Sequence, residues 1–161
     1  LSLLFETQYA CGQRLSDVLS LKPDDLTGNV LYVRQKKTGN VVTVPIPEIV
    51  TNKLLALGRQ PCEPFFKVAP RKVWREWSKL RKELGLNMKQ SPHSFRKAAS
   101  CEAAEGGASE AELQSLLGHK TARAAAIYRL EADSAILASS AMSKRGDIGM
   151  NPAQATDGQD A

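Results

Sequence analysis

Residues 91–119 of the chain read SPHSFRKAASCEAAEGGASEAELQSLLGH. Within this stretch, Ser91-Pro92 predicts the start of a helix, with Ser as the N-cap and Pro in the first helical position. The helix is expected to end just before Gly106-Gly107, because paired glycines favour a break. Ser109 and the Glu three residues later form a capping box, which predicts a second helix that Gly118 ends. The stretch therefore predicts two successive helices, and it contains both histidines of the chain.

Upstream of these helices, two segments rich in β-branched residues, Asn29–Gln35 and Val41–Ile46, flank the turn-forming pair Gly39-Asn40. This pattern predicts a β-hairpin that carries Lys36 and Lys37 near its tip. Apolar residues at helical spacing predict further helices at residues 2–10, 14–21, 48–57, 71–84 and 121 to about 142. The expected fold class is α+β, mainly α-helical with a small antiparallel β-hairpin or sheet.

The size and composition of the chain favour a single globular domain. Its 161 residues include 42% hydrophobic and 24% charged residues, which is typical of a chain that builds its own core. No apolar run approaches the roughly 18 to 20 residues that span a bilayer. Cys11, Cys62 and Cys101 lie far apart without a CxxC pair, so we expect neither a disulfide framework nor a metal site. Residues 143–161 contain few apolar residues and are expected to form a flexible tail.

The positive charge of the chain is concentrated in one segment. Residues 67–97 contain ten Lys or Arg against two Glu, a local balance of +8, whereas the whole chain carries +5. Such a cluster favours a polyanionic partner such as DNA, although a solvated basic face is an equally good interpretation. Trp74 and Trp77 share one helical face in this segment, which suits either core packing or contact with a nucleic acid.

Several polar residues have contexts that suggest chemistry. His93 and Arg96 are three residues apart, which places both on one helix face near its N-terminus, where an anion such as phosphate binds well. His119 follows Leu117-Gly118 and precedes Tyr128 by nine residues. Taken singly, the His93–Arg96 pair is better explained as a structural pair, and Tyr128 as a core tyrosine with a hydrogen-bonded hydroxyl.

The order of the motifs is more specific than any one of them, and it resembles the tyrosine recombinases, also called phage integrases. Their catalytic domain carries an Arg at a helix start, a Lys in a β-hairpin, His-x-x-Arg, Leu-Gly-His and a Tyr nine residues later. The corresponding segments here are Gly12-Gln13-Arg14, Lys37-Thr38-Gly39, His93-Ser94-Phe95-Arg96, Leu117-Gly118-His119 and Ile127-Tyr128. The resemblance covers about residues 5–130.

The resemblance implies a metal-independent and cofactor-independent reaction on DNA. Tyr128 would attack the scissile phosphate to form a 3′-phosphotyrosyl bond, and His93 would act as the general base. Arg14 and Arg96 would bind the non-bridging oxygens, and His119 would donate a further hydrogen bond to the phosphate. Lys37 would protonate the leaving 5′-oxygen. Asp17 would orient one of these cations.

The resemblance also predicts domains, partners and location. Residues 1–142 would form the catalytic domain, without the N-terminal core-binding domain, and the full-length protein would assemble as a tetramer on double-stranded DNA in the bacterial cytoplasm, without membrane association. The residues expected to contact DNA are Arg71, Lys72, Arg75, Lys79, Arg81, Lys82 and Lys97. Two alternatives to a recombinase stay open, a type IB topoisomerase and an inactive DNA-binding domain of the same fold.

Overall fold

The computed structural model describes residues 1–118 and 134–145. The elements along this part of the chain are α1 (Ser2–Cys11), α2 (Leu15–Val18), the 3₁₀ helix η1 (Pro23–Asp25), β1 (Leu26–Thr27), β2 (Val30–Arg34), β3 (Val41–Pro45), α3 (Glu48–Leu55), α4 (Pro70–Glu83), α5 (His93–Glu105), α6 (Glu110–Leu117) and α8 (Ser134–Arg145). The predicted fold class, mainly helical with a small antiparallel sheet, is confirmed.

The sheet is built on the predicted hairpin. Strands β2 and β3 pair in antiparallel register, with Leu31 opposite Val44 and Val33 opposite Val42. These four side chains are buried, because alternate residues of a strand point to the same face of a sheet. Strand β1 adds a third strand at the edge of β2. It was not predicted, since two residues are too few to show an alternating pattern.

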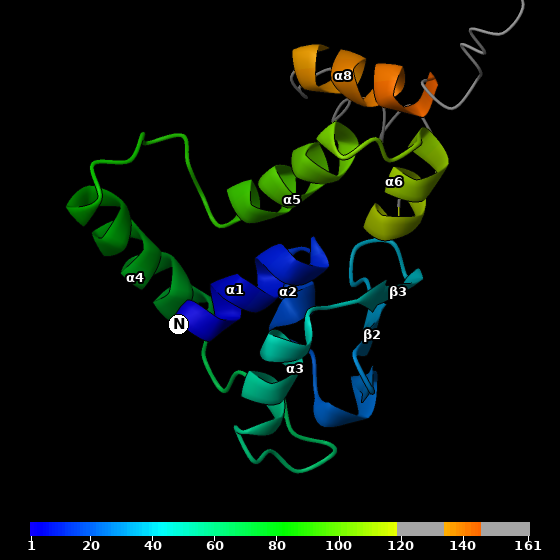
Figure 1. Ribbon diagram of the computed structural model, residues 1–161. Coiled ribbons are helices and arrows are strands. Elements are labelled where there is room, and N and C mark those ends of the chain that lie inside the picture. Colours follow the sequence, from blue (N-terminus) through cyan, green and yellow to red (C-terminus); the bar gives the residue numbers. More distant parts are fainter. Residues whose placement is uncertain (119–133, 146–161) are drawn as a thin grey trace, which may run out of the picture.

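Helix α1 lies at the centre of the molecule (Figure 1). Helices α3 and α5 pack against it. Helix α4 joins this core through three aromatic rings, Phe5 of α1, Trp77 of α4 and Phe95 of α5, whose centroids lie 5.2–5.5 Å apart. Edge-to-face and offset-stacked pairs of this kind stabilise a core beyond their buried area. The cluster therefore fixes α4 and the start of α5 relative to α1.

The predicted helices over residues 2–10, 48–57 and 71–84 are confirmed as α1, α3 and α4. The helix predicted over 14–21 is much shorter, because α2 ends at Val18. The Ser20 hydroxyl donates a hydrogen bond of 2.7 Å to the Asp17 carbonyl, and this bond stabilises the turn that follows α2, ahead of Pro23.

The two helices of the 91–119 stretch are confirmed, with one correction at the first cap. Helix α5 begins at His93, and its N-cap is Pro92 rather than Ser91. The Ser94 hydroxyl accepts a hydrogen bond of 3.2 Å from the Ser91 backbone N–H, while the Ser94 N–H donates to the Ser91 carbonyl. The Ser94 side chain therefore bonds back to the backbone before the helix, and among the described residues no side chain provides the cap predicted for Ser91. The capping box at the start of α6 is present as predicted.

The C-terminal prediction needs a revised boundary. Helix α8 continues to Arg145, three residues beyond the expected end at Met142, and the Ser143 hydroxyl bonds the Ser139 carbonyl inside it. The rest of the helix predicted from Thr121 and of the tail predicted over 143–161 lies outside the described residues. Among the described helices, none is long and apolar enough to cross a membrane.

Candidate active site

Arg14 is placed by the turn between α1 and α2. Gly12 ends α1 with a left-handed backbone, φ +64°, and Arg14 is the N-cap of α2. Its Nη1 lies 3.8 Å from Oδ2 of Asp17, and neither atom has a hydrogen-bond partner in the part of the chain that the structure describes. Asp17 is fully buried, and its Oδ1 accepts a hydrogen bond of 3.0 Å from the Lys36 backbone N–H. Asp17 therefore links the Arg14 side chain to the β2–β3 hairpin.

Arg96 reaches the same turn from α5, and it is almost completely buried. Its Nη1 donates to the Gly12 carbonyl at 3.0 Å and to Oε1 of Gln13 at 3.3 Å. Its Nη2 donates to the Leu117 carbonyl at 2.8 Å. The guanidinium thus joins the α1–α2 turn to the end of α6, so Arg96 has a structural role in addition to the phosphate contact predicted for it.

His93 is the first residue of α5, and it lines one pocket together with Arg14. Its pKa is lowered from the ordinary value, first by partial loss of hydration around the ring and then by the positive charges of Arg96 and Arg14. Because a lowered pKa favours the uncharged imidazole near neutral pH, His93 can accept a proton there. Arg14, His93 and Arg96 are therefore brought together as predicted from the sequence.

The lowered pKa of His93 is testable by NMR. Following the ring Cε1–H signal against pH should give a midpoint below the ordinary value of about 6.5, and Arg14→Gln should raise it by removing a nearby positive charge. With two histidines in the chain, His119→Asn assigns the signals. If His93 is the general base, cleavage should decline only as the pH falls through this lowered pKa. A midpoint that Arg14→Gln leaves unchanged would contradict the coupling.

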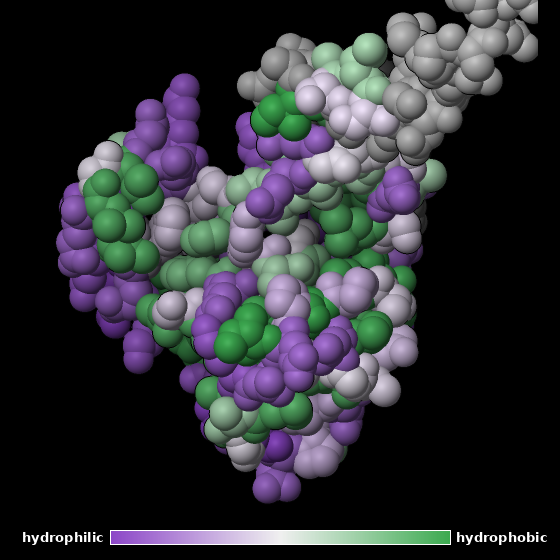
Figure 2. All heavy atoms as spheres, in the orientation of Figure 1, coloured by the Kyte–Doolittle hydropathy of each residue, from purple (hydrophilic) through white to green (hydrophobic). Residues whose placement is uncertain are grey.

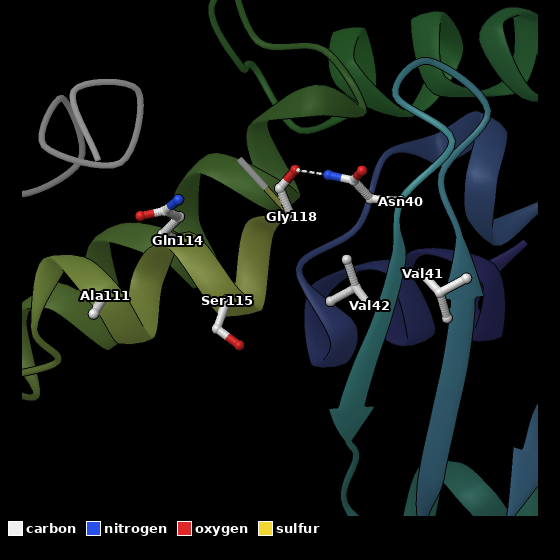
Figure 3. Close-up of a pocket in the computed structure, with 7 residues that line it drawn as sticks. All are labelled: Asn40, Val41, Val42, Ala111, Gln114, Ser115 and Gly118. Carbon is white, nitrogen blue, oxygen red and sulfur yellow. Dashed lines mark hydrogen bonds between the residues drawn. The ribbon is translucent and has the colours of Figure 1, made fainter. Parts of the chain in front are cut away.

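Lys37 projects from the exposed tip of the hairpin, and the residues around it are anchored. The Thr38 hydroxyl donates to Oε1 of Gln35 at 2.7 Å, and Asn40 Nδ2 donates to the Gly118 carbonyl at 3.1 Å (Figure 3). Nε2 of the buried Gln35 donates to the Leu117 carbonyl at 2.8 Å. The loop that carries Lys37 is thereby attached to the C-terminal end of α6.

Gln13 and Gln35 are the main site residues that the sequence analysis missed. Gln35 Nε2 donates to Oε1 of Gln13 at 2.8 Å, and Gln13 Nε2 donates to the Leu116 carbonyl at 2.7 Å. A signal for Gln35 existed, because Leu31 and Val33 point inward and the alternation places Gln35 on the same face. A buried glutamine needs hydrogen-bond partners, and here they come from three separate segments.

Gly118 lies where α6 meets the sheet. A Cβ atom added to it would lie 2.6 Å from Nε2 of Gln35 and 2.6 Å from Cγ2 of Val42, and its φ of +61° favours glycine. Figure 3 shows this approach of α6 to the start of β3, around a pocket of about 460 Å³. The glycine of the Leu117-Gly118-His119 motif therefore permits contact between the helix end and the hairpin. The predicted site residues His119 and Tyr128 lie outside the described residues.

The residues predicted to contact DNA have different surroundings. Arg75 and Lys79 are exposed on α4, where both form ion pairs with Glu76 at 3.2 and 3.4 Å. Arg81 differs, since its Nη1 donates to the Met88 carbonyl and holds the loop after α4. The others, Arg71, Lys72, Lys82 and Lys97, are exposed. Hydrophilic residues cover much of the α4 side of the molecule in the view of Figure 2.

Within residues 1–118 and 134–145, no group of three or more His, Cys, Asp or Glu could hold a metal ion.

Comparison with known proteins agrees with this geometry. The family model described as the phage integrase family matches residues 65–134. The tyrosine recombinase XerC of Rhizobium meliloti (strain 1021) is 31% identical over 134 residues, which are 74% of this chain and 42% of the relative. The integrase of Escherichia phage lambda is 29% identical over 145 residues, 80% of this chain and 41% of the relative.

Solved structures show the same fold. The catalytic domain of bacteriophage HP1 integrase matches with a TM-score of 0.68 and 21% identity, over 97% of this chain and 84% of that one. A lambda integrase dimer bound to a COC′ core site matches with a TM-score of 0.65 and 26% identity, over 79% of this chain and 41% of that one.

The chain belongs to the tyrosine recombinase, or phage integrase, family. It spans about two fifths of the length of the curated relatives it matches.

Proposed function

We propose that this chain is the catalytic domain of a site-specific DNA recombinase that cleaves and rejoins DNA through a 3′-phosphotyrosyl intermediate. The observation that carries the proposal is the meeting of Arg14, His93 and Arg96 at the α1–α2 turn. Two cations and an imidazole with a lowered pKa suit an anionic phosphate that must be attacked by a hydroxyl. Among the described residues, the buried Nη1 of Arg14 has no hydrogen-bond partner, so it keeps an unsatisfied donor at this site.

In the proposed cleavage step, the Tyr128 oxygen attacks the scissile phosphorus while the neutral His93 takes its proton. The new bond joins phosphorus to the tyrosine oxygen, and the bond from phosphorus to the 5′-oxygen breaks. Arg14 and Arg96 stabilise the negative charge that builds up on the non-bridging oxygens, and His119 donates a further hydrogen bond there.

Lys37 completes the proposed step by protonating the leaving 5′-oxygen. Its position is supported by the anchoring of the hairpin tip, through the Lys36 N–H to Asp17 and through Asn40 to the end of α6. Rejoining reverses the step, because the 5′-hydroxyl attacks the phosphotyrosine and the covalent bond conserves the energy of the phosphodiester. These cationic side chains provide the charge stabilisation that a metal ion provides in other phosphoryl-transfer enzymes, and neither metal nor ATP enters the reaction.

The proposed partner is double-stranded DNA, with assembly into a tetramer on DNA in the full-length protein and action in the bacterial cytoplasm. The exposed basic residues of α4 would contact the phosphate backbone, and such contacts weaken as salt increases. This non-specific binding to the DNA backbone would add to the contacts made at the scissile phosphate.

The test is covalent capture. The chain is incubated with a pool of nicked duplexes randomised around the nick, whose short 3′ product escapes and traps the cleaved intermediate. We expect a DNA–protein adduct that resists denaturing electrophoresis, whose DNA can be sequenced to give a defined substrate. Tyr128→Phe should form none, because the attacking oxygen is removed. Tyr32→Phe, which changes an exposed tyrosine of β2, is the matched control and should form the adduct normally.

Other outcomes of this experiment would support the alternatives. An adduct that persists in Tyr128→Phe would overturn the assignment of the nucleophile. Adducts without sequence preference, together with relaxation of supercoiled plasmid, would favour a type IB topoisomerase. Salt-dependent DNA binding without any adduct from the wild-type chain would favour an inactive DNA-binding domain.

A further inference from the structure

The two tryptophans of α4 lie in different environments although they are three residues apart. Trp77 is 5% exposed, packs between Phe5 and Phe95, and donates from Nε1 to the Gln90 carbonyl at 3.1 Å. Trp74 is 48% exposed. Core packing therefore accounts for Trp77 but leaves the large aromatic face of Trp74 without an explanation.

Trp74 lines a pocket of about 280 Å³ that also contains two residues of the candidate site. Arg14 and His93 contribute to its lining together with the apolar side chains of Leu15, Leu19 and Pro92. Within residues 1–118 and 134–145, the buried Nη1 of Arg14 has no hydrogen-bond partner, although the side chain as a whole is 22% exposed. The pocket thus combines an aromatic and aliphatic wall with a cationic group that has spare donor capacity.

This combination is complementary to a nucleotide. A phosphate is bound by a guanidinium, and a planar base or its sugar packs against an aromatic face, where stacking contributes about 1–3 kcal/mol per base. An apolar peptide would leave the Arg14 donor unsatisfied, which is unfavourable. The pocket volume lies near the lower end of the roughly 300–1,000 Å³ typical of small-ligand sites, which suits one nucleoside rather than a base pair.

The surroundings of Trp74 also favour DNA as the source of this nucleotide. Arg71 and Arg75 flank Trp74 in the sequence of α4, and both are exposed. A strand whose phosphate lies at Arg14 could therefore continue along the basic surface of α4, with one nucleoside against the indole.

We propose that Trp74 is a substrate-binding residue that stacks on the nucleoside next to the phosphate bound by Arg14. This inference rests on the proposed function, since it takes the phosphate at Arg14 to be a phosphate of DNA. Stacking is tolerant of base identity, so Trp74 strengthens binding at the reacting phosphate without selecting a sequence.

The binding test uses the intrinsic fluorescence of the two tryptophans. Tyr128→Phe, which binds DNA without cleaving it, is titrated with a nicked duplex, and quenching by iodide is measured before and after DNA addition. We expect iodide to quench free Trp74, the DNA to protect it, and Trp74→Phe in the same background to lose this signal because only the buried Trp77 remains. A duplex with an abasic nucleotide next to the scissile phosphate should protect Trp74 much less. Equal protection by the abasic duplex, or none by either, would overturn the proposal.

A kinetic test uses the duplex recovered by covalent capture. Trp74→Ala should slow adduct formation by roughly 5- to 150-fold, the equivalent of one lost stacking contact, and Trp74→Phe should retain most of the rate. On the abasic duplex, Trp74→Ala and wild type should react equally. Leu84→Ala, at an exposed residue after α4, is the matched control and should behave as wild type on both duplexes. An equal loss on intact and abasic duplexes would assign Trp74 to shaping the pocket instead.

The two tests separate this inference from the proposed function. Base-dependent protection of Trp74 without any covalent adduct would retain the nucleotide site and refute the recombinase. Adduct formation with Trp74 unprotected, or with a base-independent loss in Trp74→Ala, would retain the recombinase and refute the stacking role.

Discussion

Gly118→Ala is expected to lower the free energy of unfolding by about 2–4 kcal/mol, from left-handed backbone strain together with overpacking. The added methyl group would lie 2.6 Å from Gln35 and Val42, so the hairpin or the end of α6 must move. Movement of Gln35 would also weaken its hydrogen bond to the Leu117 carbonyl. We expect adduct formation to fall more than stability alone explains, because the same contacts hold the Lys37 loop.

Urea denaturation of the variant and of a matched glycine isolates the steric part of this effect. Gly28 has a similar left-handed backbone, φ +56°, but nothing lies within 4 Å of a Cβ added there. Gly28→Ala should therefore cost only about 1–2 kcal/mol, from backbone strain. Equal loss of unfolding free energy in the two variants would show that the close approach of α6 to the hairpin adds nothing to the cost of Gly118→Ala.

Arg96→Ala is expected to destabilise the fold by about 3–5 kcal/mol, because it opens a cavity and leaves buried carbonyl oxygens without donors. Arg14→Ala should cost less than about 1 kcal/mol, since its Nη1 has no hydrogen-bond partner among the described residues and lies 3.8 Å from the Asp17 carboxylate. Both variants should nevertheless reduce cleavage by on the order of a hundredfold or more, if both arginines stabilise the charge on the phosphate.

The contrast between these two variants separates folding from chemistry. Chemical denaturation measures the stability of each variant, and adduct formation is compared at a temperature where both are folded. Arg96→Ala as stable as Arg14→Ala would contradict the structural role of Arg96. Normal cleavage by folded Arg14→Ala would contradict its place in the site.

Sequence analysis predicted the features that depend on neighbours along the chain. The capping box of α6 and the hairpin turn are defined by residues a few positions apart, so local patterns reveal them. The shortened α2 and the N-cap of α5 were missed because each involves a single side-chain hydrogen bond that competes with the expected pattern. The Ser20 hydroxyl donates to the Asp17 carbonyl, and the Ser94 hydroxyl accepts from the Ser91 N–H.

The site was predicted in its residue types but not in its connections. The ordered motifs indicated that Arg14, His93 and Arg96 belong together, whereas the buried contacts of Gln13 and Gln35 depend on segments far apart in sequence. Helical spacing placed Trp74 and Trp77 on one face, yet only the packing of α1 and α5 distinguishes the buried ring from the exposed one. The roles of His119 and Tyr128 remain predictions.

The long-range hydrogen bonds at the α1–α2 turn and at the end of α6 have a consequence for the order of folding. Arg96 is 84 residues from its acceptor at Gly12, and Gln35 is 82 residues from its acceptor at Leu117. Contacts of such sequence separation form slowly and late, because loop closure costs entropy before the contacts stabilise the chain. A chain still emerging from the ribosome would therefore hold no assembled phosphate-binding centre until α6 had been synthesised and docked, so DNA cleavage would be confined to completely folded molecules.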